Sequence, residues 1–287
     1  MSGKETIFVS FSGGRTSGYM CKWLIDNISA NTNLIFVFAN TGQEHEETLN
    51  FVNKCDKNFG LNLVWVEAII HKQFGKGSTH KIVDFETASR HGEPFEEMIK
   101  IYGIPNPDYP HCNRELKINA IRSYKKSLGF RSRHKTAIGI RVDEIDRMSA
   151  KAKEEGLFYP LISLTQRTKE QIRHWWKAQN FDLKIPEHLG NCSTCWKKSK
   201  RKLMTIAKHE PERFDFFKRM EKENPNAGAG EDGRVFFRQY ESAEDIIKQS
   251  KHPFVEFVDT MPELQLGMFD ADLIDFEHSC GDSCEAA

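Results

Sequence analysis

The 287-residue chain lacks an excess of charge of either sign, because its 41 lysines and arginines equal its 41 aspartates and glutamates. A net charge of zero excludes a global attraction to nucleic acid or anionic lipid, so any contact with a polyanion needs a local basic patch. The chain also lacks a secretion signal at its start and any apolar run approaching the roughly 20 residues of a membrane span. We therefore expect a soluble, cytoplasmic protein without a membrane partner.

Cysteine is scarce, with seven copies, an odd number, spread over the chain. This distribution argues against a disulfide framework and for reduced thiols available for metal or redox chemistry. Cys21 and Cys55 fall in apolar stretches of expected helices, where a cysteine is usually a small core residue. Cys192 and Cys195 are separated by two residues, the spacing of a thiolate clamp, and Cys112 can join them if the fold brings it back.

Apolar periodicity indicates alternating strands and helices. Short runs rich in β-branched and aromatic residues predict buried strands at residues 7–10, 34–39, 63–66 and 136–140. Helical spacing predicts helices at residues 16–27, 44–59, 113–128 and 169–179. Glycines and prolines interrupt the pattern at residues 72–110, which predicts an irregular excursion with one short helix. The expected fold class is therefore α/β, with a doubly wound, mostly parallel sheet.

The character of the chain changes after Pro186, which suggests three parts. Residues 1–185 are expected to form the α/β nucleotide-binding domain, and residues 186–262 a helical region that carries the Cys-x-x-Cys pair. Residues 263–287 end in small and acidic side chains and are expected to be a flexible tail unless a site captures them.

A loop rich in glycine and hydroxyl side chains follows the first expected strand and opens the first expected helix. Its glycines allow a tight turn that presents backbone N–H groups, and its hydroxyls can donate to phosphate oxygens. The alternative is an ordinary glycine-rich turn that caps a helix. The second strand ends at Asn40, Thr41 and Gly42, and ligands gather at the carboxyl ends of parallel strands, so the two loops should be neighbours. The candidate nucleotide-binding residues of the first loop are Ser10, Ser12, Gly13, Gly14, Arg15, Thr16 and Ser17.

Four segments together resemble the phosphoadenosine phosphosulfate reductase family, which belongs to the PP-loop adenine-nucleotide α-hydrolases. They are Ser-Gly-Gly-x-x-Ser at 12–17, Thr41-Gly42 with Glu47, Thr48 and Phe51, Cys112 with Glu115, Leu116 and Lys117, and Gly139-Ile140-Arg141 with Glu144 and Arg147. The resemblance implies that residues 12–17 hold the phosphates of an adenine nucleotide and that residues 40–42 border the adenosine. The nucleotide could be phosphoadenosine phosphosulfate (PAPS), adenylyl sulfate (APS) or ATP. Gly139 and Arg141 would lie beside it, since a guanidinium suits both phosphate and sulfate.

The resemblance extends to the iron–sulfur branch of this family. Its reductases that act on adenylyl sulfate hold a 4Fe-4S cluster on a Cys-Cys pair and a later Cys-x-x-Cys pair. The three cysteines introduced above match three of these ligands, and His111 stands in the place of the fourth. The fourth ligand could be His111, Cys280 or Cys284, or the fourth iron could stay open, as in similar ATP-dependent tRNA thiolases. Zinc is the less expected metal, because a second clean cysteine pair is missing.

Three functional hypotheses follow. A reductase would use Cys280 as the nucleophile on the nucleotide's sulfur and a thioredoxin-like donor, with Lys117 and Arg114 supplying charge near the cluster. An ATP-dependent sulfur transferase would act on tRNA or DNA, and Trp196 with the basic run 197–202 could grip its backbone, unless that run is only a solvated helix face. A non-enzymatic nucleotide-sensing module is the third. The composition leaves room for a homodimer.

Overall fold

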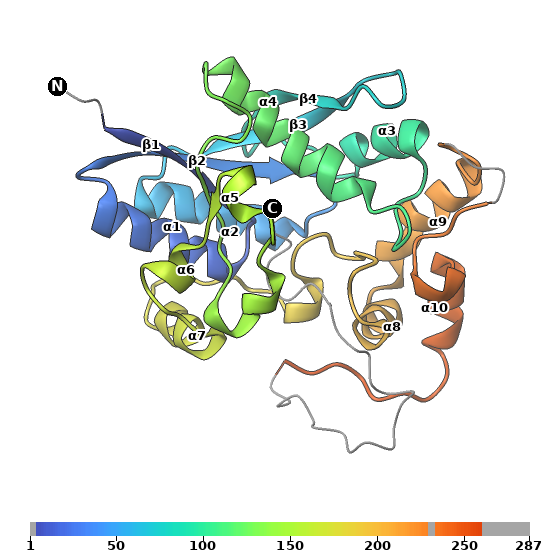
Figure 1. Ribbon diagram of the computed structural model, residues 1–287. Helices are drawn as coiled ribbons and strands as arrows, with labels where there is room; N and C mark the ends of the chain where they lie inside the picture. Colours follow the sequence, from blue (N-terminus) through green and yellow to red (C-terminus); the bar gives the residue numbers. More distant parts are fainter. Residues whose placement is uncertain (1–3, 229–232, 260–287) are drawn as a thin grey trace.

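A computed structural model describes residues 4–228 and 233–259 of the chain. In this part, six strands form one sheet in the order β4-β3-β2-β1-β5-β6 (Figure 1). The strands are β1 Glu5–Ser10, β2 Thr32–Asn40, β3 Val64–Ile70, β4 Ser78–Val83, β5 Thr136–Ala137 and β6 Leu157–Phe158. All neighbours pair in parallel except β4, which is antiparallel to β3. The expected α/β fold with a mostly parallel sheet is confirmed.

Strand β4 lies inside the segment that the sequence predicted to be irregular. It pairs with β3 from Trp65 opposite Val83 to Ile70 opposite Ser78, which makes a hairpin at the edge of the sheet. None of its six residues is buried, and Ile82 is 63% exposed, so no buried apolar face marks the strand in the sequence. The short helix expected in this segment is α3, Glu93–Tyr102.

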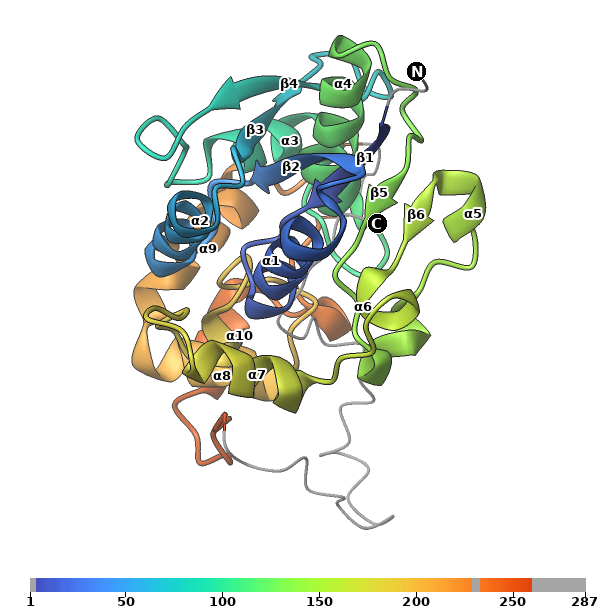
Figure 2. The ribbon, with the colours of Figure 1, turned by 90° about the vertical axis from the view of Figure 1, so that its left-hand side faces the viewer.

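Helices cover both faces of the sheet. Helices α1 (Arg15–Ile28) and α2 (Glu46–Phe59) lie on one side, with α7 (Lys169–Lys177) beyond α1, and α3 and α4 (Asn119–Ser127) lie on the other (Figure 2). Trp176 of α7 is buried, and its indole N–H donates to the carbonyl oxygen of Arg15 at 2.8 Å. Helix α7 therefore anchors the start of α1, where the glycine-rich loop ends.

The helix predicted over residues 113–128 consists of two elements. A π-helix spans Asn113–Ile118 and continues directly into α4. The π-helix begins just after Cys112 and buries Leu116 and Lys117. Because π-helices are rare and frequently occur at functional sites, this irregularity draws attention to the segment that carries Cys112.

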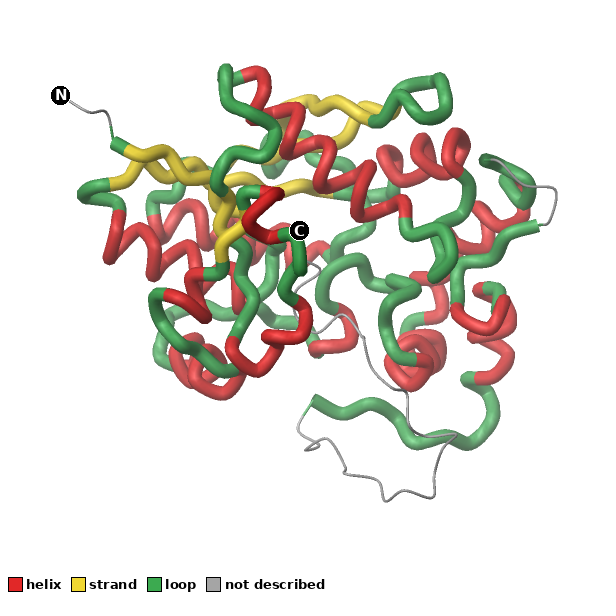
Figure 3. Tube along the Cα trace, in the orientation of Figure 1, coloured by secondary structure: helices red, strands yellow, loops and turns green. Residues whose placement is uncertain are grey.

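Three helices after residue 186 pack beyond the carboxyl ends of β1 and β2, and loops lie between them and the sheet (Figure 3). They are α8 Lys200–His209, α9 Asp215–Glu223 and α10 Ala243–Gln249, with short turns at Glu187–Leu189, Pro211–Phe214 and Arg238–Tyr240. Between β5 and α7 lie the Val142–Arg147 turn and the one-turn helices α5 Ala152–Glu155 and α6 Pro160–Ser163.

One hydrophobic core contains residues from both sides of residue 185, such as Phe38 and Phe217. Across the described residues, no helix combines the length and the apolar character that crossing a bilayer requires.

Candidate nucleotide and cysteine site

The glycine-rich loop is a preformed turn between β1 and α1. Gly13 has a φ of +89°, and a Cβ placed on it would lie 2.8 Å from Cγ2 of Thr48, so both the backbone and the space require glycine. The hydroxyls of Ser12 and Ser17 lie 2.8 Å apart, and Ser12 N–H donates to the Ser17 hydroxyl at 3.2 Å. These bonds hold the loop in place before any ligand is bound.

Arg141, which the resemblance placed beside the nucleotide, lies against this loop. Its guanidinium is almost fully buried and donates to Thr16 Oγ1 at 2.8 Å. It also forms ion pairs with Asp143 at 3.1 Å and with Glu144 at 3.3 Å. Glu144 accepts a second ion pair from Arg147, while its buried Oε2 has no hydrogen-bond partner in the described part of the chain. The loop therefore faces a network of two cations and two carboxylates.

Arg15 points away from the loop. Its Nε donates to Asp182 at 2.8 Å, and Nη2 donates to the carbonyl oxygen of Leu183. This position favours a structural role for Arg15, which ties α1 to the segment that follows α7. The Arg15 guanidinium is thus engaged outside the loop, whereas the hydroxyls of Ser12, Thr16 and Ser17 make their hydrogen bonds within it or to Arg141.

The end of β2 forms the neighbouring part of the site. Asn40 is fully buried and donates through Nδ2 to Glu67 at 2.6 Å and to the carbonyl oxygen of Ser89 at 2.8 Å. Thr41 donates through its backbone N–H and its hydroxyl to the carboxylate of Glu44, at 2.9–3.0 Å. Neither carboxylate was singled out from the sequence, because a single acidic residue near a strand end carries no distinctive spacing.

The three candidate cysteine ligands meet at one cavity. Cys112, Cys192 and Cys195 line it together with Thr41 and Lys117. The Cys192 segment is held there by an isolated β-bridge between Glu44 and Cys192, and by Ser193 N–H donating to the carbonyl oxygen of Gln43 at 3.1 Å. The fold thus brings the distant Cys112 back to the Cys-x-x-Cys pair, directly beside the end of β2.

The cavity also presents polar atoms that lack partners. Asn113 and Trp196 are among the lining residues, and the buried Asn113 Oδ1 and Trp196 indole N–H make no hydrogen bond in the described part of the chain. Burial, the carboxylate of Glu44 and the nearby Cys112 raise the pKa of Cys192 far above its ordinary value. Within the described ranges, no three His, Cys, Asp or Glu residues are grouped closely enough to hold a metal ion as they stand.

His111 and Arg114 lie outside this cavity. The His111 ring packs against Tyr102 and Tyr109, with centroid distances of 5.8 and 6.0 Å, and its Nδ1 lies 3.3 Å from Arg114 Nη2. Burial, with the charges of Arg114 and Arg234, lowers the pKa of His111. The structure therefore does not bring His111 together with the three cysteines. Cys280 and Cys284 lie outside the described residues.

The basic run at 197–202 is not a uniformly solvated helix face. Lys198 is buried and donates to the carbonyl oxygen of Gly190 at 2.7 Å, and buried Lys202 pairs with Glu187 at 3.0 Å. Lys200 pairs with Glu241 at 2.6 Å. Much of the positive charge of this run is thus satisfied inside the protein.

Fold and site together define an α/β protein with a phosphate-loop candidate beside a three-cysteine cavity. The phosphoadenosine phosphosulfate reductase domain matches this chain over residues 6–180, more than half of its length, and the chain belongs to that family. The segment matched covers the loop, the end of β2, Cys112 and Arg141, whereas Cys192 and Cys195 lie beyond it.

Similar proteins occur in a phage and in an archaeon. The uncharacterized nin region protein ORF290 of Escherichia phage lambda is 38% identical over 206 residues, which cover 70% of this chain and 69% of that protein. An uncharacterized protein of Methanocaldococcus jannaschii is 26% identical over 121 residues, 42% of this chain but only 20% of its own length.

Two solved structures are also similar. A phosphoadenylyl-sulfate reductase from Candida auris, in a phosphate complex, shares 15% identity and a TM-score of 0.36, covering 60% of this chain and 71% of that one. The U34-tRNA thiolase NcsA from Methanococcus maripaludis, with its 4Fe-4S cluster, shares 16% identity and a TM-score of 0.42, covering 87% of this chain and 72% of that one.

Proposed function

We propose that this protein is an enzyme that binds an adenine nucleotide at residues 12–17 and holds an iron–sulfur cluster on Cys112, Cys192 and Cys195. The observation that carries the proposal is the cavity shared by three cysteines from two distant segments, which Thr41 at the end of β2 also lines. A donor set of three thiols in one cavity suits a 4Fe-4S cluster, and the unpaired Trp196 N–H could donate to a cluster sulfide.

In this proposal the chain's own residues position the nucleotide. The N–H groups and hydroxyls of residues 12–17 would bind its phosphates, and Arg141 would neutralise charge next to Thr16. Lys117, buried at the cavity, would place positive charge between nucleotide and thiols. When bound, the cluster would supply redox-active iron or an iron that binds sulfide.

The first candidate reaction is reduction of a sulfonucleotide, PAPS or APS. The Cys280 thiolate would attack the sulfur, the bond between that sulfur and the phosphate oxygen would break, and the adenosine phosphate would leave. A dithiol of the thioredoxin class would then reduce the resulting thiosulfonate, which releases sulfite and leaves the donor as a disulfide. Arg141, which donates to Thr16 of the proposed phosphate loop, would stabilise the anionic leaving group.

The second candidate is ATP-dependent transfer of sulfur to a nucleic acid. An oxygen of the acceptor would attack the α-phosphorus of ATP and expel pyrophosphate, and a sulfide would then displace AMP from the adenylated position. The sulfide would come from inorganic sulfide, or from a persulfide that a dithiol of the thioredoxin class reduces to thiol and sulfide while the dithiol becomes a disulfide. This candidate is supported by the position of His111, which lies outside the cavity. Among the described residues, the cavity then offers a cluster three cysteine ligands, which would leave a fourth iron open to bind sulfide.

Anaerobic purification tests the shared part of both reactions. We expect brown protein with about four irons and four sulfides per chain, and loss of both in Cys112→Ala and Cys195→Ala. Cys55→Ala is the matched control, because Cys55 is a buried core cysteine of α2 and should leave the iron content unchanged. Colourless protein that contains zinc would exclude the cluster.

The two reactions are then separated with the same preparation. Release of sulfite from PAPS or APS that depends on Cys280 supports reduction. Release of pyrophosphate from ATP that depends on a nucleic acid acceptor supports sulfur transfer. If neither product appears while the nucleotide still binds, the protein is a nucleotide-sensing module instead.

A further inference from the structure

Exposed aromatic rings and cations gather beside Cys112, outside the cysteine cavity. Tyr109 is 40% exposed, and the guanidinium carbon of Arg234 lies 3.7 Å from its ring centroid. Phe74, at the tip of the β3–β4 hairpin, is 54% exposed and packs on Tyr102 with a centroid distance of 5.2 Å. We call the surface formed by Phe74, Tyr109, His111, Arg114 and Arg234 the aromatic–cation platform.

The platform is built from three segments that are bonded to one another. The hairpin is fixed by Gly77 N–H, which donates to the hydroxyl of buried Tyr102 at 2.9 Å. Arg234 donates to the carbonyl oxygen of Tyr102 at 3.1 Å. Asn106 joins the other two segments, because its Nδ2 donates to the carbonyl oxygen of Val235 at 3.0 Å while its Oδ1 accepts from Tyr109 N–H at 3.0 Å. The exposed rings are therefore held in place rather than left free to collapse.

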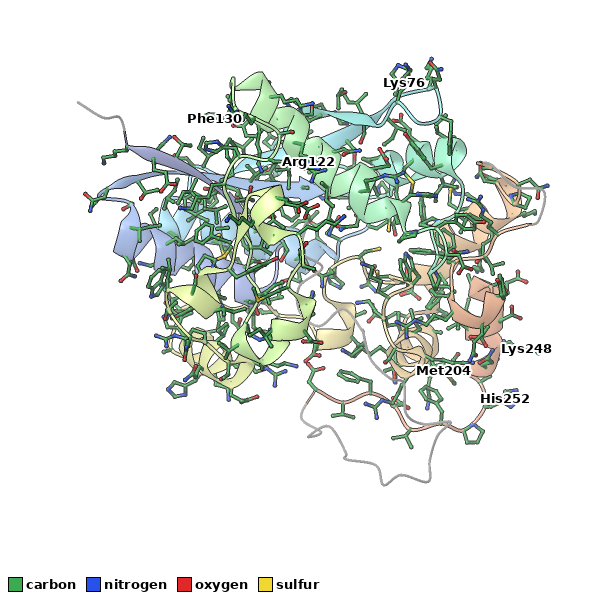
Figure 4. The ribbon with its side chains drawn as sticks, viewed as in Figure 1. Lys76, Arg122, Phe130, Met204, Lys248 and His252 are labelled. Carbon is green, nitrogen blue, oxygen red and sulfur yellow. The ribbon has the colours of Figure 1, made fainter. Side chains whose placement is uncertain are left out.

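The charge around these rings is mainly positive. Arg114 is half exposed and lies 5.8 Å from the ring centroid of Tyr102. Lys72 and Lys76 are exposed on the hairpin tip, where Lys76 projects from the outer edge of the molecule (Figure 4). Within residues 4–228 and 233–259, the nearby carboxylates are those of Asp108, which is exposed, and of Glu115, which is buried and paired with Arg114 at 2.7 Å. The chain is neutral overall, so this is a local patch of the kind that contact with a polyanion needs.

We propose that the aromatic–cation platform binds single-stranded nucleic acid, a substrate class that rests on the sulfur-transfer candidate for this site. Fixed aromatic faces that alternate with arginines suit unpaired bases, which stack on the rings while the cations contact the phosphates. Stacking requires bases that are not already paired, so a duplex fits the exposed rings poorly. His111 is next to Cys112 in the chain, so a strand on the platform would run directly past the cysteine cavity.

The platform is a better candidate for this contact than the basic run at 197–202. In that run Lys198 and Lys202 are buried and Lys200 is paired with Glu241, so their charge is used within the protein. The platform combines the exposed rings of Phe74 and Tyr109 with half-exposed Arg114, and exposed Lys72 and Lys76 lie on the hairpin tip beside it. We therefore assign the nucleic acid contact to the aromatic–cation platform, and not to the run 197–202 that the sequence indicated.

Fluorescence anisotropy on the full-length chain tests the platform with labelled single-stranded RNA and DNA 20-mers and matching duplexes. We expect single strands to bind more tightly than duplexes and binding to weaken as salt rises. Phe74→Ala and Tyr109→Ala should each weaken binding about tenfold, because each removes one stacking ring. Tyr109→Phe keeps the ring and should bind nearly as the wild type does. Equal affinity for single strands and duplexes, or no binding at low salt, would overturn the proposal.

Two control variants test whether a loss of oligonucleotide binding is specific to the platform. Tyr240→Ala removes a tyrosine that is 80% exposed but not part of the platform, and Lys57→Ala removes a cation at the end of α2. Both should bind as the wild type does, and an equal loss in these controls would contradict the assignment. Cys112→Ala should lose iron but keep oligonucleotide binding. Protein that holds a cluster and releases sulfite but binds no oligonucleotide would reject this inference and leave the proposed function standing.

Discussion

The guanidinium of Arg141 donates to Thr16 Oγ1 at 2.8 Å, which joins the segment after β5 to the first turn of α1. The same guanidinium pairs with Asp143 and Glu144, so its position is fixed from two sides. If the glycine-rich loop binds phosphate as proposed, a cation held rigidly beside it loses little side-chain freedom when the anion binds.

Arg141→Lys should therefore weaken nucleotide binding by about 10- to 100-fold, the effect of losing a planar, charge-assisted contact. Calorimetric titration with ATP, PAPS and APS would measure the affinity. Arg173→Lys, which changes an arginine paired with Glu187 far from the loop in sequence, serves as the control. Unchanged affinity in Arg141→Lys would mean that this arginine does not reach the phosphates or sulfate.

Arg15→Ala should affect stability more than nucleotide binding. The Arg15 guanidinium bonds to Asp182 and to the Leu183 carbonyl oxygen, and its removal should lower the free energy of unfolding by about 1–3 kcal/mol. Chemical denaturation and nucleotide titration on one preparation separate the two effects. A large loss of affinity with unchanged stability would instead support the direct phosphate contact expected from the sequence.

Glu187 should make the protein sensitive to acid. Burial alone would raise its pKa, but Lys202 and Lys169 lower it to about 2. The stabilisation from this carboxylate is therefore present above pH 4.5 and is lost as the pH falls from 4.5 towards 2. Glu187→Gln should lower the free energy of unfolding at pH 7 by about 3–5 kcal/mol, because Lys202 would be left buried and unpaired. Glu170→Gln, at an 82% exposed side chain, should change stability little in the same denaturation series.

Glu221 should produce the opposite pH dependence. Burial raises its pKa to about 7, although its carboxylate accepts N–H bonds from Phe236 at 3.0 Å and Ala243 at 2.9 Å. The stability that its protonated form supplies is fully present below pH 4.5 and is lost as the pH rises through about 7. The free energy of unfolding should fall by on the order of 1–3 kcal/mol between pH 5 and pH 8. In Glu221→Gln this slope should disappear, and a slope that persists would assign it to another group.

The juxtaposition of the two loops of the candidate nucleotide site could be predicted from the sequence because its signals are local. A buried strand followed by glycines and hydroxyls, and a second strand ending at Asn40, place two loops at one edge of a parallel sheet. The convergence of Cys112 with Cys192 was anticipated only through the family resemblance, because their separation in the chain carries no geometric information. The structure brings them together through the bridge between Glu44 and Cys192.

Other features depend on tertiary contacts that no local pattern encodes. Strand β4 has few apolar residues and exists because β3 offers it an edge, as Ile82 opposite Val66 illustrates. The burial of Lys198 follows from a carbonyl oxygen at Gly190 that is available only in the folded chain. The His111 ring is positioned by the neighbouring rings of Tyr102 and Tyr109. The spacing of these residues in the sequence does not indicate that contact.

The bridge between Glu44 and Cys192 gives the two halves of the site a common backbone connection. Glu44 holds Thr41 through its carboxylate and pairs with Cys192 through its main chain, while Gln43 accepts from Ser193 N–H. A displacement of the chain at residues 41–44 is therefore transmitted to the thiol-bearing segment without passing through a flexible side chain. The backbone position of residues 41–44 and that of the Cys192 segment are thus fixed relative to each other by main-chain contacts.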